Sequence, residues 1–199
     1  MINLILQFYK VKYKNTQQDL LNERQQELNY CFINNLLNKN IDKVHFLFEL
    51  QEDVDYMNKV LKDLNIITDK LILHNLGKRM NYKSIFTYAN NYYNRNLIEN
   101  PVWIYCHCDM LIYSGFDKLK TFNFDSSNIY TITAHKNNCN KSFNCNCTRQ
   151  FQTNKGIYTP TMDGFVFKTP IKESAVDECN HVVHIMGAEN RLVAKLKNY

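Results

Sequence analysis

Residues Pro101 to Asp109 read Pro-Val-Trp-Ile-Tyr-Cys-His-Cys-Asp, and this stretch decides the fold that we expect. Its four consecutive apolar residues, two aromatic and two β-branched, lie between a proline and a polar segment. Such a run is typical of a central strand that is covered on both faces. Ligands of open α/β sheets bind just beyond the carboxyl ends of the strands. We therefore expect His107 and Asp109 at the mouth of a binding crevice.

The sequence before this strand alternates between strand and helix patterns. Short apolar runs predict strands at Ile2–Tyr9, Val44–Phe48 and Leu71–Leu73. Between them, apolar residues recur at helical spacing from Gln17 to Leu36, from Asp53 to Leu64 and from Tyr82 to Leu97, with Asn81 suited to cap the last of these helices. The order β-α-β-α-β-α-β predicts an α/β fold with a mainly parallel central sheet flanked by helices.

Beyond Asp109 the pattern changes. We expect a short turn or helix at Gly115–Phe122, strands at Ile129–Thr133 and Gly164–Lys168, and a closing helix at Glu189–Lys197. Residues 135–159 are polar and rich in Asn and Cys, which is typical of a functional lid, a ligand-binding segment or a disordered loop. We see neither an internal repeat nor a linker, so we expect one domain over residues 1–199.

Composition and charge restrict the class of protein. The 199 residues have 45% apolar and 13% aromatic side chains, which argues against disorder. The net charge of +5 is spread along the chain, so it indicates either a solvated basic surface or attraction to a polyanion or a phosphorylated small molecule. Residues 1–9 are too short for a membrane span and lack the features of a signal peptide. Seven cysteines, an odd number, favour free thiols and a reducing, cytoplasmic location.

Three groups of polar residues are candidates for chemistry. Asp109 could hold a hard divalent cation that bridges a diphosphate, or it could cap the next element. Asp163 follows Thr161 and Met162 in a turn that enters a strand, where a carboxylate could act as a base or anchor a sugar hydroxyl. The segment Gly187–Arg191 places polar residues at the first turn of the closing helix, as a polar-ligand site or as a local cap.

The cysteines suggest a rival site. A zinc ion needs four nitrogen or sulfur ligands, and the polar loop offers His135, Cys139, Cys145 and Cys147. Together with nearby lysines and Arg149, this loop could form a zinc-stabilised module that binds nucleic acid. The spacing matches no familiar zinc motif, and the basic residues lack the interleaved aromatics of a stacking platform. We therefore expect free thiols and no nucleic-acid partner.

Taken in order, these motifs make the chain resemble small GT-A-fold glycosyltransferases that use nucleotide sugars, including those encoded by large DNA viruses. Residues 23–27 look like the family's opening and residues 41–49 like its second strand. Residues 78–82 with Phe86 are similar to its Arg-Pro-x-Tyr-x-x-x-Phe helix start, and residues 103–110 to its strand with an Asp-x-Asp motif. Residues 161–167 look like Ser-Gln-Asp-Ala-Trp-Ile-Phe, and residues 187–191 like Gly-Cys-Asp-Asn-Arg. His107 departs from the motif, because it takes the place of the first aspartate.

The resemblance implies transfer of a sugar from a nucleotide diphosphate, with a UDP-sugar as the expected donor, to a hydroxyl of a glycan or glycoprotein acceptor. It implies Mn²⁺ or Mg²⁺ held by Asp109 and His107, and a location in the host cytoplasm if the protein is viral. The implied nucleotide-sugar-binding residues are Glu49, Lys78, Arg79, Tyr82, His107, Asp109 and Asn190, and the implied catalytic residues are Asp163, Glu189 and Arg191.

By the same resemblance, residues 1–109 form a nucleotide-binding half and residues 110–199 an acceptor and sugar half. His181 and His184 are either extra metal ligands or structural residues. The alternative to the enzyme is a non-catalytic domain that binds sugar nucleotides or glycans, which the histidine at position 107 favours.

Overall fold

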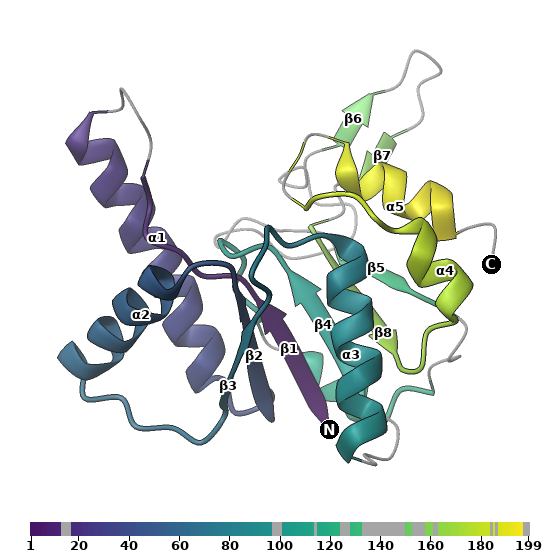
Figure 1. Cartoon of the computed structure of the whole chain (residues 1–199), viewed down its shortest axis with the longest axis horizontal. Coiled ribbons are helices and arrows are strands. Elements are labelled where there is room, and N and C mark those ends of the chain that lie inside the picture. Colours follow the sequence, from purple (N-terminus) through teal and green to yellow (C-terminus); the bar gives the residue numbers. More distant parts are fainter. Residues whose placement is uncertain are drawn as a thin grey trace.

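The centre of the protein is a six-stranded sheet with the strand order β3-β2-β1-β4-β8-β5 (Figure 1). The computed structural model describes residues 1–12, 17–96, 101–113, 115–123, 128–132, 150–152, 158–160, 163–183, 185 and 187–196. The strands of the sheet are β1 (Ile2–Leu6), β2 (Lys43–Phe48), β3 (Leu71–Asn75), β4 (Val102–Cys106), β5 (Tyr130–Ile132) and β8 (Gly164–Lys168). A separate two-stranded sheet pairs β6 (Gln150–Gln152) with β7 (Tyr158–Pro160).

The first four strands run parallel to one another, and the last two of the large sheet do not. β8 pairs antiparallel with β4, and β5 pairs antiparallel with β8. β4 therefore has a neighbour on each side and is fully buried, as its apolar run predicts. The α/β fold class with a mainly parallel sheet is confirmed.

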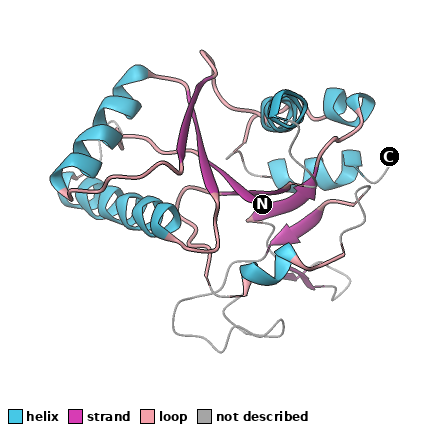
Figure 2. Ribbon diagram, turned by 90° about the horizontal axis from the view of Figure 1, so that it is seen from below, coloured by secondary structure: helices cyan, strands magenta, loops and turns pink. Residues whose placement is uncertain are grey.

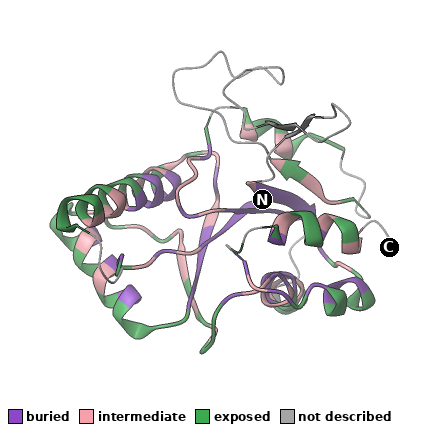
Figure 3. Ribbon diagram, turned by 90° about the horizontal axis from the view of Figure 1, so that it is seen from above, coloured by how far each residue is buried: buried purple, intermediate pink, exposed green. Residues whose placement is uncertain are grey.

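Two groups of helices cover the two faces of the sheet (Figure 2). α1 (Gln18–Leu37) and α2 (Gln51–Asp63) pack with the short 3₁₀ helix η1 (Phe116–Lys120) against one face. α3 (Tyr82–Asn96), α4 (Glu173–Glu178) and α5 (Ala188–Leu196) pack against the other. The burial pattern follows this arrangement, because buried residues lie along the central strands and the inner helix faces (Figure 3).

Side chains alternate in direction along a strand, so one strand contributes residues to the cores on both faces of the sheet. Ile104 and Cys106 of β4 belong to the core beneath α1 and α2, whereas Trp103 and Tyr105 belong to the core beneath α3. Trp103 is fully buried, stacks on Phe167 of β8, and donates its indole N–H to the Thr169 hydroxyl at 3.2 Å. The buried indole ring thus packs against another aromatic ring, and its N–H has a hydrogen-bond acceptor.

The element boundaries agree closely with the predicted ones where a pattern is long. α3 begins at Tyr82, and Asn81 caps it by accepting the Ser84 N–H at 2.7 Å. α4 is missing from the sequence prediction because its six residues, with only Ala175 and Val176 buried, are too few to show a helical period. Strands β6 and β7 are also missing from that prediction, since three-residue strands carry no usable alternation.

Several predictions fall outside the described residues. These are the zinc loop with His135, Cys139, Cys145 and Cys147, the turn residues Thr161 and Met162, and His184. The four cysteines that the structure describes, Cys31, Cys106, Cys108 and Cys179, are free and buried. Within the described part of the chain, no helix is long and apolar enough to cross a bilayer.

Candidate functional site

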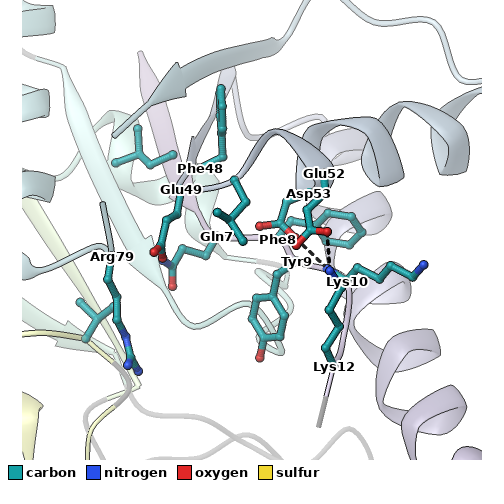
Figure 4. A pocket seen from close by; sticks show the side chains of 13 residues that line it. Gln7, Phe8, Tyr9, Lys10, Lys12, Phe48, Glu49, Glu52, Asp53 and Arg79 are labelled. Carbon is teal, nitrogen blue, oxygen red and sulfur yellow. Dashed lines mark hydrogen bonds and ion pairs between the residues drawn. The ribbon is translucent and has the colours of Figure 1, made fainter. Parts of the chain in front are cut away.

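A cavity of about 530 Å³ lies beyond the carboxyl ends of β1 and β2 (Figure 4). One wall is the segment that follows β1, residues 7–12, and another is the junction between β2 and α2, residues 47–53. Arg79, just before α3, and Val183 complete the lining. This is the edge of the sheet at which α/β proteins bind their ligands. The structure thus brings together two of the residues singled out in the sequence, Glu49 and Arg79.

The cavity carries charges of both signs next to aromatic walls. Its cations are Lys10, Lys12 and Arg79, its acids are Glu49, Glu52 and Asp53, and its aromatic residues are Phe8, Tyr9 and Phe48. Lys12 is neutralised by an ion pair with Glu52. Arg79 makes no ion pair with any residue that the structure describes, and Figure 4 shows it on the same side of the view as Glu49 and Gln7, away from Lys10 and Lys12. Arg79 is thus a cation that is placed to meet an anionic ligand.

Asp53 is a member of this site that sequence reasoning missed. Its side chain is buried and accepts the backbone N–H of Lys10 at 3.1 Å, so it ties the segment after β1 to α2. Burial raises the pKa of Asp53, and the Lys10 N–H opposes that rise. The available signal was an acidic residue in the first turn of a predicted helix, which usually indicates only helix-dipole stabilisation.

The strand register connects this cavity to the end of β4. β1 pairs in parallel with β2 through Leu6 and Phe46, and with β4 through Ile5 and Tyr105. Two residues further along the β1–β4 pairing, the same register sets Gln7, after β1, beside His107. Alternation then directs the side chains of Gln7 and His107 to the α3 face of the sheet, as it does for Ile5 and Tyr105.

His107 belongs to a hydrogen-bonded cluster with Tyr82 and Glu189. The His107 Nε2 lies 3.1 Å from Glu189 Oε1, and the Tyr82 hydroxyl donates to the same oxygen at 3.3 Å. Burial acts to raise the pKa of Glu189, but hydrogen bonds from His107, from the Glu189 backbone N–H and, least of these, from Tyr82 outweigh it and hold that pKa below its usual value. Burial, together with the Glu189 charge, raises the pKa of Tyr82. Glu189 is therefore an ionised, oriented carboxylate.

Asp163 lies next to this cluster through the backbone. Its carbonyl accepts the His107 N–H at 3.2 Å, and its own N–H donates to Ile132 at 2.9 Å. Two further polar atoms close by, the Tyr105 hydroxyl and His181 Nδ1, are buried and have no hydrogen-bond partner among the described residues. Both rings contact Tyr82, with centroids 5.9 and 5.1 Å away. Buried polar atoms without partners are rare, so this cluster has hydrogen-bonding capacity in reserve.

Asp109 lies on the other side of the sheet edge. Its carboxylate forms an ion pair with Arg24 of α1 at 2.8 Å, and it is not among the residues that line either cavity described for this protein. Burial alone would raise the pKa of Asp109, but Arg24 lowers it overall. His107 and Asp109 thus bond to helices on opposite faces of the sheet, although they are two residues apart in sequence.

This geometry tests the fit of a divalent cation. A cation at Asp109 would have to replace the Arg24 guanidinium, and His107 directs its Nε2 to Glu189 instead of toward Asp109. Among the described residues, no three His, Cys, Asp or Glu side chains come together as a metal site. The residues in this arrangement therefore do not fit a Mn²⁺ or Mg²⁺ ion shared by His107 and Asp109.

The remaining residues from the sequence prediction lie apart from the first cavity. Lys78 lines a second cavity, on the outer side of α3. Asn190 and Arg191 are exposed in the first turn of α5, next to Glu189. The structure therefore distributes the predicted site over a cavity with Glu49 and Arg79 and a cluster with Tyr82, His107 and Glu189.

We compared the chain with known proteins by sequence and by structure, and only the structure comparison found similar proteins. No protein-family model matches the sequence, and no curated protein matches it. The structure is similar to the crystal structure of HddC from Yersinia pseudotuberculosis, with a TM-score of 0.50 and 11% identity over 91% of this chain and 81% of that chain.

Two further solved structures give lower scores. The 4-diphosphocytidyl-2C-methyl-D-erythritol synthase from Anaerococcus prevotii DSM 20548 gives a TM-score of 0.48 and 12% identity over 95% of this chain and 81% of that chain. The 2-C-methyl-D-erythritol 4-phosphate cytidylyltransferase (IspD) from Francisella tularensis gives a TM-score of 0.47 and 14% identity over 98% of this chain and 81% of that chain. With TM-scores below 0.5, these two matches carry no argument.

None of the three proteins is named as a glycosyltransferase, so the family resemblance noted in the sequence stays a prediction. At 11% identity, the likeness to HddC concerns the fold alone. The chain is therefore a single α/β domain that shares its fold with HddC.

Proposed function

We propose that the chain transfers a sugar from a nucleotide diphosphate donor, with a UDP-sugar as the first candidate, to an acceptor hydroxyl. The observation that carries this proposal is the cavity of about 530 Å³ beyond β1 and β2, which contains both Glu49 and Arg79. Its volume lies in the range of small-molecule sites. An arginine that pairs with no described residue, opposite aromatic walls, suits a ligand with a flat base and phosphate groups.

The residues of the cavity would bind the nucleotide. The Arg79 guanidinium presents several N–H donors in one plane, which matches the oxygens of a phosphate group. Glu49 would accept hydrogen bonds from a ribose hydroxyl or from a base N–H. Phe8, Tyr9 and Phe48 provide apolar surface for the base. Asp53 would act indirectly, because it positions the Lys10 backbone at the rim.

The cluster at the end of β4 would serve the sugar and the acceptor. In the transfer step the acceptor oxygen bonds to the anomeric carbon, the bond from that carbon to the diphosphate breaks, and the acceptor proton passes to a base. Glu189 is ionised and held by His107 and Tyr82, so it is our candidate for that base. Asp163 would anchor a sugar hydroxyl, and Asn190 and Arg191, exposed beside Glu189, would contact the acceptor.

A divalent cation stays a separate proposal, and no step above depends on it. Mn²⁺ or Mg²⁺ would supply positive charge to the leaving diphosphate if Asp109 exchanged Arg24 for the ion. The arrangement with Arg24 bound does not support that exchange, so the experiment has to test the metal and the nucleotide separately.

Calorimetric titration of the protein with UDP tests nucleotide binding. We expect binding, at least a tenfold loss of affinity in Arg79→Gln because a phosphate contact worth more than about 1.4 kcal/mol disappears, and a smaller loss in Glu49→Gln. Lys59→Gln, on the exposed surface of α2, is the matched control and keeps full affinity. Absence of binding by UDP and every other nucleoside diphosphate would exclude the proposal. If Arg79→Gln binds UDP as tightly as the wild type does, UDP does not bind in this cavity.

The metal is tested in the same titration with MnCl₂ and with EDTA. A gain in UDP affinity with Mn²⁺ that disappears in Asp109→Asn supports the cation at this residue. Equal UDP affinity with MnCl₂ and with EDTA would show that the ion takes no part in nucleotide binding. The assignment of the cavity as the nucleotide site would not change.

A second candidate function is binding of a sugar nucleotide without turnover. The Arg24–Asp109 ion pair favours it, because it occupies the carboxylate that the resembling family would use for its metal. Incubation with UDP-, GDP- and dTDP-sugars and detection of released nucleoside diphosphate separates the two functions. Release of diphosphate excludes the binder, and tight binding without release excludes the transferase for the donors tested.

A further inference from the structure

A second cavity, of about 400 Å³, lies on the outer side of α3 and shares no lining residue with the first. Its floor is the outward face of α3, one wall comes from the end of β3 and the turn after it, and Asn180 closes it near the start of the helix. The Asn81 amide holds Asn180 in place with a hydrogen bond of 2.9 Å. The cavity is thus built from three separate segments of the chain.

The charge of this cavity has one sign. Lys78, Lys83 and Arg95 line it, and no acidic residue is among its described lining residues. Lys83 has an ion pair with Asp177 at 2.7 Å, whereas Lys78 and Arg95 have no ion pair with any residue that the structure describes. His74 also lines the cavity, and its pKa is lowered by burial and, to a smaller extent, by the positive charge of Arg95. A negatively charged ligand is therefore favoured.

The lining residues of this cavity extend along α3. Ser84, Tyr88, Asn91 and Arg95 follow one another at spacings of four, three and four residues, so they form one stripe along α3. At a rise of about 1.5 Å per residue, this stripe is about 16 Å long. Lys78 and Lys83 lie at one end of it and Arg95 at the other, with neutral hydroxyl and amide side chains between them. A ligand that used the whole length would be extended and would carry charges well apart.

The two aromatic residues that line the cavity, Tyr88 and Tyr92, already pack against core residues. Tyr88 is 9% exposed, and its hydroxyl lies 2.8 Å from His45 Nδ1. Tyr92 packs edge-on against His45 and Trp103, with ring centroids 4.7 and 5.7 Å away. Single-stranded nucleic acids bind through exposed ring faces on which successive bases stack. Rings held in this way favour a ligand that needs hydrogen bonds and charge more than stacking.

We propose that this groove is a second binding site, and that it takes an acidic oligosaccharide, whose carboxylate or sulfate groups meet the cations at its two ends. The hydroxyl and amide side chains between the cations, among them Thr87 and Asn91, suit the many hydroxyl groups of sugar rings. The site does not depend on the function proposed for the first cavity, because the two cavities have no residue in common.

The test is titration of the full chain with a heparin tetrasaccharide and, separately, with a hyaluronan hexasaccharide. Maltotetraose is the uncharged probe, and a ten-nucleotide oligouridylate is the nucleic-acid probe. We expect at least one acidic oligosaccharide to bind more tightly than maltotetraose and oligouridylate. Arg95→Glu should reduce that affinity at least fivefold, whereas Lys59→Glu, the same charge reversal on α2, should not.

A second variant protects the test against a folding defect. Asn91→Asp keeps the shape of an exposed side chain and adds negative charge in the middle of the groove, so it should also weaken binding of the acidic oligosaccharide. UDP affinity, which reports on the first cavity, should be the same in Arg95→Glu, Asn91→Asp and the wild type. If the wild-type protein does not bind UDP, this result contradicts the proposed function but does not affect the proposal of a glycan site in the groove.

Three outcomes overturn the groove as a glycan site. The first is that neither acidic oligosaccharide binds. The second is equal loss of affinity in Arg95→Glu and Lys59→Glu, which shows attraction to the whole basic surface. The third is tighter binding of oligouridylate than of both oligosaccharides, which assigns the groove to nucleic acid.

Discussion

His45 shows how a single residue can set the response of the protein to acid. It lies in β2, is fully buried, and is bracketed by Asn3 of β1 and Tyr88 of α3. Because the Asn3 oxygen accepts only, the Nε2–H of His45 donates to it at 3.1 Å, and Nδ1 accepts the Tyr88 hydroxyl at 2.8 Å. Burial, with a smaller effect of Lys43, lowers the pKa of His45 to about 3. The imidazole is therefore neutral in the folded protein.

Acid should destabilise the protein through this residue. Since the pKa of His45 is lower in the folded than in the unfolded chain, the unfolded chain takes up a proton first as the pH falls below about 6.5. This effect should remove about 2 kcal/mol of the free energy of unfolding between pH 7 and pH 5. Urea unfolding at the two pH values measures it. His45→Gln keeps hydrogen-bonding groups but does not titrate, so an unchanged pH dependence in this variant would refute the explanation.

At the scale of elements, α3 is the helix on which both cavities depend. Its inner face, with Tyr82, Ile85, Phe86 and Ala89, packs against β4 and β8. Its outer stripe forms the floor of the second cavity, and Arg79, just before its first turn, lines the first. The start of α3 therefore contributes residues to both sites.

Asn81 fixes that start, so Asn81→Ala should lower the free energy of unfolding by about 1 kcal/mol, the usual cost of a lost N-cap. The Ser84 backbone N–H loses its acceptor in this variant, whereas the Ser84 hydroxyl keeps its hydrogen bonds to the backbone of residue 81. The measurement is urea unfolding at pH 7, and Asn58→Ala on the exposed surface of α2 is the matched control. Equal stability of the two variants would show that the cap does not hold the helix end.

At the scale of the whole molecule, β8 unites the two halves of the chain. Residues 1–109 supply β1 to β4, and β8 adds the C-terminal half to the same sheet by pairing antiparallel with β4. The pairing is close at Gly164, where a Cβ atom would lie 2.6 Å from the Tyr105 carbonyl oxygen. The absence of a side chain here lets the strand approach at the point where His107 and Asp163 meet.

Gly164→Ala should therefore force β8 away from β4 and lower the free energy of unfolding by about 1–3 kcal/mol, as overpacking does in a well-packed core. A thermal melt followed by circular dichroism measures the loss. Ser174→Ala, on the exposed surface of α4, is a control that changes a small residue to alanine without a steric clash. A melting temperature equal to that of the control would mean that the sheet absorbs the added methyl group.

The local sequence determined where most strands and helices lie. The apolar run at 102–105, the helical periods and the Asn81 cap predict elements that the structure contains with small shifts at their ends. These signals depend on neighbours a few residues away, so they can be read along the chain. They also predict the mainly parallel sheet, because strands and helices alternate.

Only the tertiary structure decided which side chains meet. The sequence suggested one site with His107 and Asp109, whereas the fold pairs Asp109 with Arg24, 85 residues away, and His107 with Glu189, 82 residues away. It likewise brings Asp53 to the first cavity and Arg95 to the second. The physical reason is that an ion pair or a cavity wall depends on how separate elements pack against the sheet, and nothing in the local pattern of either partner records the position of the other.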